Sequence, residues 1–562
     1  MTDTVIGEQA ALFQRVYEEL GIPQDARVQR FQTLIEMLEY AFASFPGRAA
    51  FSSLGFTLSY ADVDRLSGNF ASWLQNHTDL KPGDRIAVQM PNLVQYPVVV
   101  LGALRAGMVI VNTNPLYSAR EIEHQFNDAE VKALVVQANV AQTVAGVLPN
   151  TGVKHVLVTE LADLHPPVKR LLINNVAKYV KKMVPPFDIS GAGTLNQALK
   201  LGAKKPHQTV SMQRNGLALL QYTGGTTGVA KGAMLSHGNL VANILQVDAL
   251  FASHNLADED REILQPLPVY HIYAFMTSIY TLLNGFHMVY IPNPRDLDSV
   301  VKAMRTYRPS IFCGLNTLFV ALCHNDGFKG LDFSRLKVTL SGGMALSHAA
   351  ANHWQEVTGC EIAEGYGLTE TSPVVSSNPG NRKIIGTIGP PLPGTEVKVV
   401  DESGTALGIG ERGELLVRGP QVMLGYWQRP EETAKVMDSE GWFSTGDVAV
   451  IRSDGFLQIV DRIKDMIVVS GFNVYPNELE DVLYAHEDVL ECAAVGVPDD
   501  VSGEIIKMFV VSASGQLTAD EVRAFCRQNL TAYKVPKLVE FRDELPKTNV
   551  GKILRRELRD KP

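Results

Sequence analysis

The sequence predicts an α/β protein: a large N-terminal domain of two doubly wound α/β subdomains with a small β-barrel, followed by a C-terminal α+β domain. Three observations support this prediction. Short apolar runs alternate with amphipathic helical patterns over much of the chain, as in parallel sheets covered by helices. Residues 394–460 instead show short strands separated by glycine-rich turns. The 562 residues also exceed what one hydrophobic core usually supports, so several domains are expected.

Strand and helix patterns alternate through the first part of the chain, after a helical stretch in residues 1–45. Ser59 is placed to cap one helix, and Ser118-x-x-Glu121 is a capping box that opens another. Apolar runs predict strands at residues 85–90, 108–112, 132–137 and 155–159, with a helix around residues 98–104. Such alternation indicates a parallel, doubly wound sheet.

A stretch rich in glycine and threonine lies near the middle of the chain. The apolar run of residues 217–222 ends there, so residues 217–239 predict a buried strand, a loop and then a helix. Glycines let backbone N–H groups converge on phosphate oxygens, while threonine hydroxyls add donors. This is not a Walker A loop, which has a glycine directly before its lysine and a serine or threonine after it, because Ala230 and Gly232 flank Lys231 here. We favour a phosphate-binding loop over a surface turn, with these candidate ligands: Thr223, Gly224, Gly225, Thr226, Thr227, Gly228 and Lys231.

A second alternating set follows this loop. Strands are expected at residues 288–291, 310–314, 336–341 and 361–364, and helices at residues 299–305 and 348–357. After the glycine-rich strands, a boundary falls at residues 461–465 and separates a domain of residues 1–460 from one of residues 466–562. The second domain predicts a helix at 478–483, strands at 493–497 and 505–511, and a last helix opened by the capping box Thr518-x-x-Glu521.

Charge and composition narrow the function classes. The net charge of −9 argues against sequence-independent nucleic-acid binding, which needs a basic surface. The five cysteines are scattered without a C-x-x-C pair, which indicates a reduced, cytoplasmic compartment. The N-terminus lacks the basic and apolar regions of a signal peptide. Polar residues interrupt the most apolar long segment, residues 266–292, so it predicts buried structure rather than a membrane span.

Residues 168–183, VKRLLINNVAKYVKKM, form a basic amphipathic segment. One helical face carries Val168, Leu171, Leu172, Val176, Tyr179, Val180 and Met183. The other face carries Lys169, Arg170, Lys178, Lys181 and Lys182. Such a helix can lie in a membrane interface beside anionic lipid, which would place the protein at the inner face of the cell membrane. The alternative is a surface helix that packs its apolar stripe on the protein, and both stay open.

Six stretches occur in an order that is typical of one superfamily. They are YTGGTTGVAKG (222–232), PLPVYHIYAF (266–275), SGGM (341–344), EGYGLTET (364–371), GWFSTGDVAV (441–450) with DGFLQIVDRIKD (454–465), and PKTNVGKILRREL (546–558). Together they resemble the adenylate-forming enzymes, which include acyl-CoA synthetases, firefly luciferases and peptide-synthetase adenylation domains. The resemblance covers essentially the whole chain, and residues 440–480 are most similar to bacterial long-chain fatty-acid CoA ligases.

The resemblance implies a site for ATP and Mg²⁺. It assigns Tyr366 to adenine stacking, Asp447 and Arg462 to the ribose hydroxyls, and Thr369 to a phosphate contact. Glu370 is implied to bind Mg²⁺, which usually takes one or two carboxylates together with substrate phosphates. The rest of the implied nucleotide site comprises Gly342, Gly343, Met344, Glu364, Gly365 and Gly367.

The resemblance also implies catalytic and mobile parts. Lys552 matches the lysine that acts in adenylation, and Lys464 lies at the hinge about which the C-terminal domain rotates. Rotation would withdraw Lys552 and present Gly471, Phe472 and Asn473 to a CoA tunnel. His271 lies where the superfamily often has an aromatic residue or histidine near the carboxylate; the alternative is a core histidine. Candidates to line an acyl tunnel are Tyr270, Tyr273, Phe275, Gly314, Leu315 and Val374.

The implied function is a ligase that uses ATP and Mg²⁺ to join medium- or long-chain fatty acids to CoA through an acyl-adenylate, with AMP and pyrophosphate as products. The alternatives are a fatty-acyl-AMP ligase that passes the acyl group to a carrier protein, a luciferase-like oxygenase, and a non-catalytic lipid or nucleotide sensor. The sensor ranks low because Lys552, Glu370 and Asp447 are all present. Chain-length preference and oligomeric state, including a homodimer, stay open.

Overall fold

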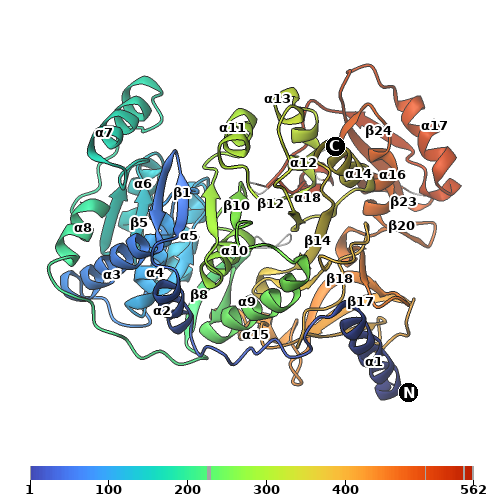
Figure 1. Ribbon diagram of the computed structural model, residues 1–562. Coiled ribbons are helices and arrows are strands. Elements are labelled where there is room, and N and C mark those ends of the chain that lie inside the picture. Colours follow the sequence, from blue (N-terminus) through green and yellow to red (C-terminus); the bar gives the residue numbers. More distant parts are fainter. Residues whose placement is uncertain (1, 224–229, 500, 549–550, 560–562) are drawn as a thin grey trace.

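The computed structural model describes residues 2–223, 230–499, 501–548 and 551–559 (Figure 1). Two α/β sheets, a smaller antiparallel sheet and a C-terminal α+β unit make up the structure, which confirms the predicted α/β fold class. In place of the predicted small β-barrel, the structure has a four-stranded antiparallel sheet. Part of the predicted phosphate loop lies outside the described residues, namely Gly224, Gly225, Thr226, Thr227 and Gly228.

The first sheet has the strand order β7-β6-β5-β3-β4-β8-β9 and is parallel up to β8. Its strands are β3 (Arg85–Gln89), β4 (Val109–Asn112), β5 (Val131–Gln137), β6 (His155–Thr159), β7 (Gly193–Thr194), β8 (Leu217–Thr223) and β9 (Lys231–Ser236). The helices of this part are α3 (Tyr60–His77), α4 (Gln95–Arg105), α5 (Ala119–Asp128), α6 (Ala141–Val147), α7 (Pro167–Asn175) and α8 (Leu195–Gly202). The predicted cap of α3 and capping box of α5 are both confirmed.

The helix predicted directly after the glycine-rich loop is wrong. β8 and β9 pair antiparallel, with Thr223 opposite Lys231, so a strand comes first. Helix α9 (His237–Phe251) begins only after β9, at the N-cap Ser236. The strand forms because its other edge also finds partners: the Met234 N–H donates to the Gly425 carbonyl oxygen at 2.9 Å. Tertiary hydrogen bonding from a distant segment therefore decides the local structure.

The second sheet has the strand order β15-β14-β13-β12-β10-β11-β1-β2, with antiparallel pairs only at its two ends. Its strands are β1 (Ala49–Ser53), β2 (Phe56–Ser59), β10 (Glu262–Gln265), β11 (His287–Tyr290), β12 (Ile311–Gly314), β13 (Val338–Ser341), β14 (Ile362–Gly367) and β15 (Val374–Ser377). The early β1–β2 hairpin joins this later sheet, with Phe51 opposite Met288. The helices are α9, α10 (Ile272–Leu283), α11 (Leu297–Tyr307), α12 (Asn316–Cys323), α13 (Asp326–Lys329) and α14 (His348–Thr358).

The glycine-rich part folds as an antiparallel sheet of β16 (Glu396–Val400), β17 (Arg412–Arg418), β18 (Phe443–Ile451) and β19 (Leu457–Arg462), next to α15 (Pro430–Ala434). The C-terminal unit contains β20 (Ile467–Val469), β21 (Phe472–Val474), β22 (Val489–Asp499), β23 (Gly503–Ser512) and β24 (Leu538–Phe541). Its helices are α16 (Pro476–Tyr484), α17 (Ala519–Asn529) and α18 (Arg555–Arg559), and the capping box of α17 is confirmed.

Two helices precede the first sheet, α1 (Thr2–Leu20) and α2 (Leu34–Ser44). The basic amphipathic segment forms α7 and a following π-helical turn, η2 (Val176–Val180). Most of its apolar side chains are exposed, so the alternative in which the stripe packs on the protein is wrong. Among the residues that the structure describes, no helix combines the length and apolar character that a membrane crossing requires.

Candidate active site

A cavity of about 1600 Å³ lies at the carboxyl ends of β13 and β14. The ends of neighbouring parallel strands are where α/β sheets usually bind ligands. Helices α9 and α10, strands β18 and β19, and the segment around Lys552 form the other walls. The cavity thus lies between the large N-terminal part and the C-terminal unit.

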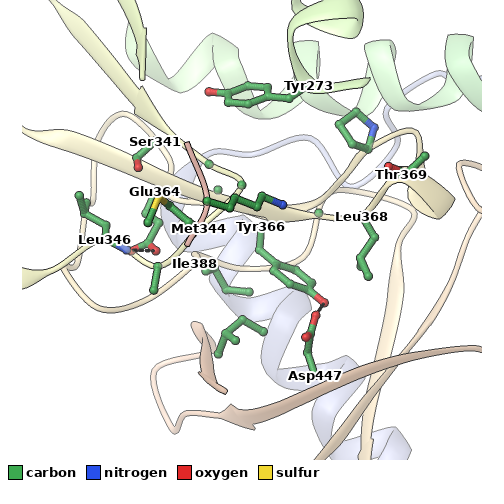
Figure 2. Close-up of a pocket in the computed structure, with 18 of the residues that line it drawn as sticks. Tyr273, Ser341, Met344, Leu346, Glu364, Tyr366, Leu368, Thr369, Ile388 and Asp447 are labelled. Carbon is green, nitrogen blue, oxygen red and sulfur yellow. Dashed lines mark hydrogen bonds between the residues drawn. The ribbon is translucent and has the colours of Figure 1, made fainter. Parts of the chain in front are cut away.

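A tyrosine and a carboxylate meet on one wall of this cavity. Figure 2 shows Tyr366 of β14 pointing toward Asp447 of β18, and its hydroxyl donates to Asp447 Oδ2 at 2.5 Å. Strand pairing places Arg462 opposite Asp447, and Arg462 Nε lies 3.4 Å from Asp447 Oδ1. Burial raises the pKa of Asp447, while Arg462 and the Tyr366 hydroxyl oppose that rise. This arrangement offers an aromatic face beside a carboxylate that can accept hydroxyl hydrogen bonds.

A second carboxylate is held by a tyrosine that the sequence analysis missed. Glu370 follows β14 in a 3-10 turn that also carries Thr369, and both residues line the cavity. The Tyr426 hydroxyl donates to Glu370 Oε1 at 2.7 Å. Lys231 Nζ lies 5.2 Å from the centre of the Tyr426 ring and 2.5 Å from Glu432 Oε2. Tyr426 therefore links the predicted metal ligand to the predicted phosphate lysine.

The C-terminal unit delivers Lys552 to the cavity. Lys552 Cε lies 3.6 Å from the position that a Cβ on Gly343 would take, and Gly343 has a φ of +89°. The neighbouring Gly551 rests on α12, since a Cβ there would lie 3.2 Å from Thr317 Oγ1. Burial, reinforced by Arg462, lowers the pKa of Lys552 to about 8, against the opposing effect of Asp447 and Glu370. Lys552 is therefore a partly desolvated cation beside two carboxylates.

Ionic contacts hold the two parts together around the predicted hinge. On α14, the His348 backbone N–H donates to Asp481 Oδ1 at 2.9 Å, and His348 Nδ1 lies 3.0 Å from Asp481 Oδ2. Lys464 lies in a 3-10 turn (Ile463–Asp465) and lines the cavity. Burial, with Arg462 adding to it, lowers the pKa of Lys464 to about 8. Arg559 of α18 binds Asp465 at 3.1 Å, so the turn is tied to the C-terminal unit.

His271 lines the cavity and also caps helix α10. Its Nδ1 accepts the Tyr273 backbone N–H at 3.4 Å. Burial, together with Lys552, lowers the pKa of His271 to about 3, so the ring is neutral near pH 7. His271 therefore has a structural partner within its own helix and also lines the cavity, and its position near the substrate carboxylate stays a prediction.

The remaining nucleotide-site predictions also fall on the cavity wall: Thr223, Gly342, Gly343, Met344, Glu364, Gly365 and Gly367. Glu364 is buried, and burial raises its pKa to about 8. Its Oε1 accepts the Leu346 N–H at 3.3 Å, as Figure 2 shows.

The predicted acyl-site residues divide into two groups. Tyr270, Tyr273 and Val374 line the cavity. Three others, Phe275, Gly314 and Leu315, are buried in the protein core and do not line it. Instead, an apolar extension runs between α9 and α10, lined by Ile244, Val247, Leu250, Phe251, Met276 and Tyr280. Apolar residues on these helices share one sequence pattern whether they face the core or the cavity, so the sequence could not separate them.

The predicted CoA-side residues lie away from the cavity in this arrangement. Gly471, Phe472 and Asn473 belong to the β20–β21 hairpin and do not line it. The Phe472 side chain is exposed and stacks on Tyr533, with ring centres 4.9 Å apart.

Comparisons with known proteins agree with this architecture. The family described as "AMP-binding enzyme" matches residues 38–427, and the "AMP-binding enzyme C-terminal domain" matches residues 478–552. A "Long-chain-fatty-acid--CoA ligase" of Haemophilus influenzae is 48% identical over 535 residues, which are 94% of this chain and 95% of that protein. ATP-bound MatB from Rhodopseudomonas palustris superposes with a TM-score of 0.81 at 29% identity, covering 94% of this chain and 98% of that one. Apo MatB, at the same identity and coverage, gives 0.72. The chain therefore belongs to the family of AMP-binding enzymes.

Proposed function

We propose that this protein is an ATP-dependent long-chain fatty-acid–CoA ligase. It joins a fatty acid to CoA through an acyl-adenylate and releases AMP and pyrophosphate. The observation that carries the proposal is the position of Lys552, which reaches from the C-terminal unit over Gly343 into a cavity continuous with an apolar extension. The relatives named long-chain-fatty-acid–CoA ligase, nearly half identical over almost the whole chain, support the same substrate class.

The polar end of the cavity fits ATP and Mg²⁺. The Tyr366 ring suits adenine, Asp447 suits the ribose hydroxyls, and the cations Lys231 and Lys552 suit phosphate. Glu370 presents a carboxylate, which is the ligand type that Mg²⁺ prefers in combination with phosphate oxygens. A bound Mg²⁺ would neutralise charge on the phosphates.

The chemistry follows from these positions in two steps. First, a carboxylate oxygen of the fatty acid attacks the α-phosphorus of ATP, and the bond to the β-phosphate breaks to release pyrophosphate. Lys552 stabilises the negative charge that develops around the α-phosphate. Second, the CoA thiolate attacks the acyl carbon and AMP leaves. Rotation about residues 461–465 would remove Lys552 and bring the β20–β21 hairpin to the site for this step. The higher TM-score to ATP-bound than to apo MatB supports an adenylation-competent arrangement here.

The apolar extension suits the acyl chain. It starts beside His271 and Tyr273 and follows α10 to Tyr280, about 10 Å along the helix axis. Phe251 and Tyr280 pack edge to face at its far end, with ring centres 5.6 Å apart. These aromatic rings therefore limit how much of a chain fits between α9 and α10.

The proposed function is tested by measuring AMP release with ATP, Mg²⁺ and CoA over a series of fatty acids from short to very long. We expect release that requires CoA and is fastest with long chains. If AMP release or the amount of trapped adenylate does not depend on CoA, the acyl group would instead pass to another acceptor, such as a carrier protein.

Narrowing the apolar extension should change chain-length preference. Met276→Trp adds a large ring to the wall formed by α10, so we expect kcat/KM for palmitate to fall at least tenfold while that for butyrate, whose chain is too short to pass this position, changes little. AMP release measures both values. Met276→Leu, which nearly conserves volume, is the matched control and should keep the native preference. If kcat/KM fell equally for both substrates, the extension would not be part of the acyl site.

The Tyr426 hydroxyl should tune the response to Mg²⁺. Tyr426→Phe removes the hydrogen bond to Glu370 but keeps the ring beside Lys231. Because a hydrogen bond from an outer-shell partner orients a carboxylate that binds metal, and its loss costs about 10- to 100-fold in metal affinity, we expect the apparent affinity for Mg²⁺ to fall at least about tenfold. A Mg²⁺ titration of AMP release at fixed ATP measures this, with KM for fatty acid as a second readout that should stay constant. The exposed Tyr40, replaced by Phe, is the control. An unchanged Mg²⁺ dependence would contradict this role.

A further inference from the structure

A basic and apolar surface stands out from the first α/β sheet, away from the cavity. It is formed by α7 and η2, which project from the side of the molecule in Figure 1. We call the exposed residues of this stretch, 168–183, the α7 surface. One side of the stretch is attached to the protein: Ala177 is buried, and the Asn174 side chain bonds the Glu160 carboxylate and the Ala162 N–H, each at 2.9 Å. The opposite side is therefore presented outward.

Large apolar side chains dominate that outward side. Val168 is 81% exposed, Val180 is 73% exposed and Leu171 is 65% exposed. Leu172, Tyr179 and Met183 are exposed as well, and no other stretch of this length in the described part of the chain exposes as many large apolar residues. A contiguous exposed apolar patch of this kind marks an interaction surface.

The charge of the α7 surface identifies its partner. It carries Lys169, Arg170, Lys178, Lys181 and Lys182, and the sequence has no acidic residue between Asp163 and Asp188. The protein as a whole has a net charge of −9, so this positive stretch is a local exception. A second copy of the chain would bring the same positive charges and be repelled. Nucleic acid could pair its phosphates with the lysines, but it has no apolar region in which the six exposed hydrophobic side chains could be buried.

We propose that the α7 surface docks on an anionic lipid bilayer, with its lysines at the headgroups and its apolar side chains in the interface. An amphipathic helix with basic and large apolar residues is suited to this position. The docking does not depend on the catalytic activity. It complements the proposed function, because long-chain fatty acids partition into membranes and the enzyme would then meet its substrate there.

Co-sedimentation with vesicles tests the proposal, without ATP or fatty acid present. The probes are vesicles of phosphatidylcholine and phosphatidylglycerol in equal parts, and vesicles of phosphatidylcholine alone. We expect binding to the anionic vesicles, weaker binding to the neutral ones, and weakening by salt because exposed charges are screened. The triple variant Lys178→Gln, Lys181→Gln, Lys182→Gln should bind anionic vesicles about 100-fold more weakly. The control variant Lys200→Gln, Lys204→Gln, Lys302→Gln loses the same charge from other exposed positions and should bind normally.

A second variant tests the apolar part. Leu171→Ser with Leu172→Ser should weaken binding to anionic vesicles at least tenfold, since two leucines no longer leave water. Its AMP release with octanoate should remain native, which separates docking from catalysis. The proposal would be overturned if the native protein did not bind anionic vesicles. It would also be overturned if the triple lysine variant bound them as strongly as the native protein. A dimer detected by sedimentation velocity without lipid, and dissociated by the leucine changes, would assign the surface to a second copy instead.

Discussion

Replacement of Lys552 by alanine is expected to slow adenylate formation by about 100- to 1000-fold, while transfer from supplied acyl-adenylate to CoA keeps its rate. The reason is positional. Lys552 lies over Gly343 beside Asp447 and Glu370, so its ammonium is preorganised where phosphate charge develops. In the proposed mechanism, transfer to CoA breaks the bond between acyl group and AMP after the C-terminal unit has rotated, so Lys552 would take no part in it. Pyrophosphate release reports the first step, and acyl-CoA formed from synthetic acyl-adenylate reports the second.

The neighbouring Lys547 provides the control for this variant. Its ammonium pairs with Glu491 of the C-terminal unit, so Lys547→Ala removes a lysine from the same motif but should leave adenylation within a few-fold of native. Equal loss of both half reactions in Lys552→Ala would contradict the role assigned to this lysine.

The pKa of the same lysine, Lys552, leads to a prediction of how the rate of adenylation depends on pH. The charged form is the one that stabilises phosphate, and burial lowers the pKa of Lys552 to about 8. The charged fraction therefore falls above pH 8, and kcat/KM for adenylation should drop tenfold for each further pH unit. In Lys552→Arg the guanidinium stays charged, so whatever activity remains should not show this drop. Lys464 has a similarly lowered pKa, and Lys464→Ala should keep the drop if Lys552 is its source.

Replacement of Lys464 by proline is expected to slow thioester formation by about 100-fold and to change adenylation little. Lys464 lies in the 3-10 turn between the two parts of the protein, and rotation there requires a change of backbone dihedral angles. Proline holds φ near −65°, which suits a 3-10 turn but prevents the change of φ that a rotation at this residue would need. The present arrangement, with Lys552 in the cavity and the β20–β21 hairpin outside it, should therefore remain accessible.

This prediction is tested by measuring the rates of adenylation and of thioester formation separately in the Lys464→Pro variant. Lys464→Ala removes the same side chain but leaves φ free, so it should retain most of the thioester step. If proline slows both steps equally, or leaves CoA transfer unchanged, Lys464 is not the hinge.

Prediction from the sequence succeeded for structural features that depend only on residues close together in the chain. The capping boxes at Ser118 and Thr518 place the starts of α5 and α17, because the hydrogen bonds that define them join residues three apart. Prediction failed at β9, where Met234 bonds a backbone group of Gly425, far along the chain. It also missed Tyr426, because nothing in its local sequence shows that its hydroxyl meets Glu370.

The sequence by itself determined the fold class, the residue types at the polar end of the cavity, and the positive and apolar character of residues 168–183. These follow from neighbours along the chain, so periodicity and motifs reveal them. The tertiary structure decided which apolar side chains of α9 and α10 face the cavity, how far burial lowers the pKa of Lys552, and that α7 turns its apolar side to solvent. Each of these depends on contacts between residues far apart in the chain, and burial and electrostatic effects exist only once those contacts form.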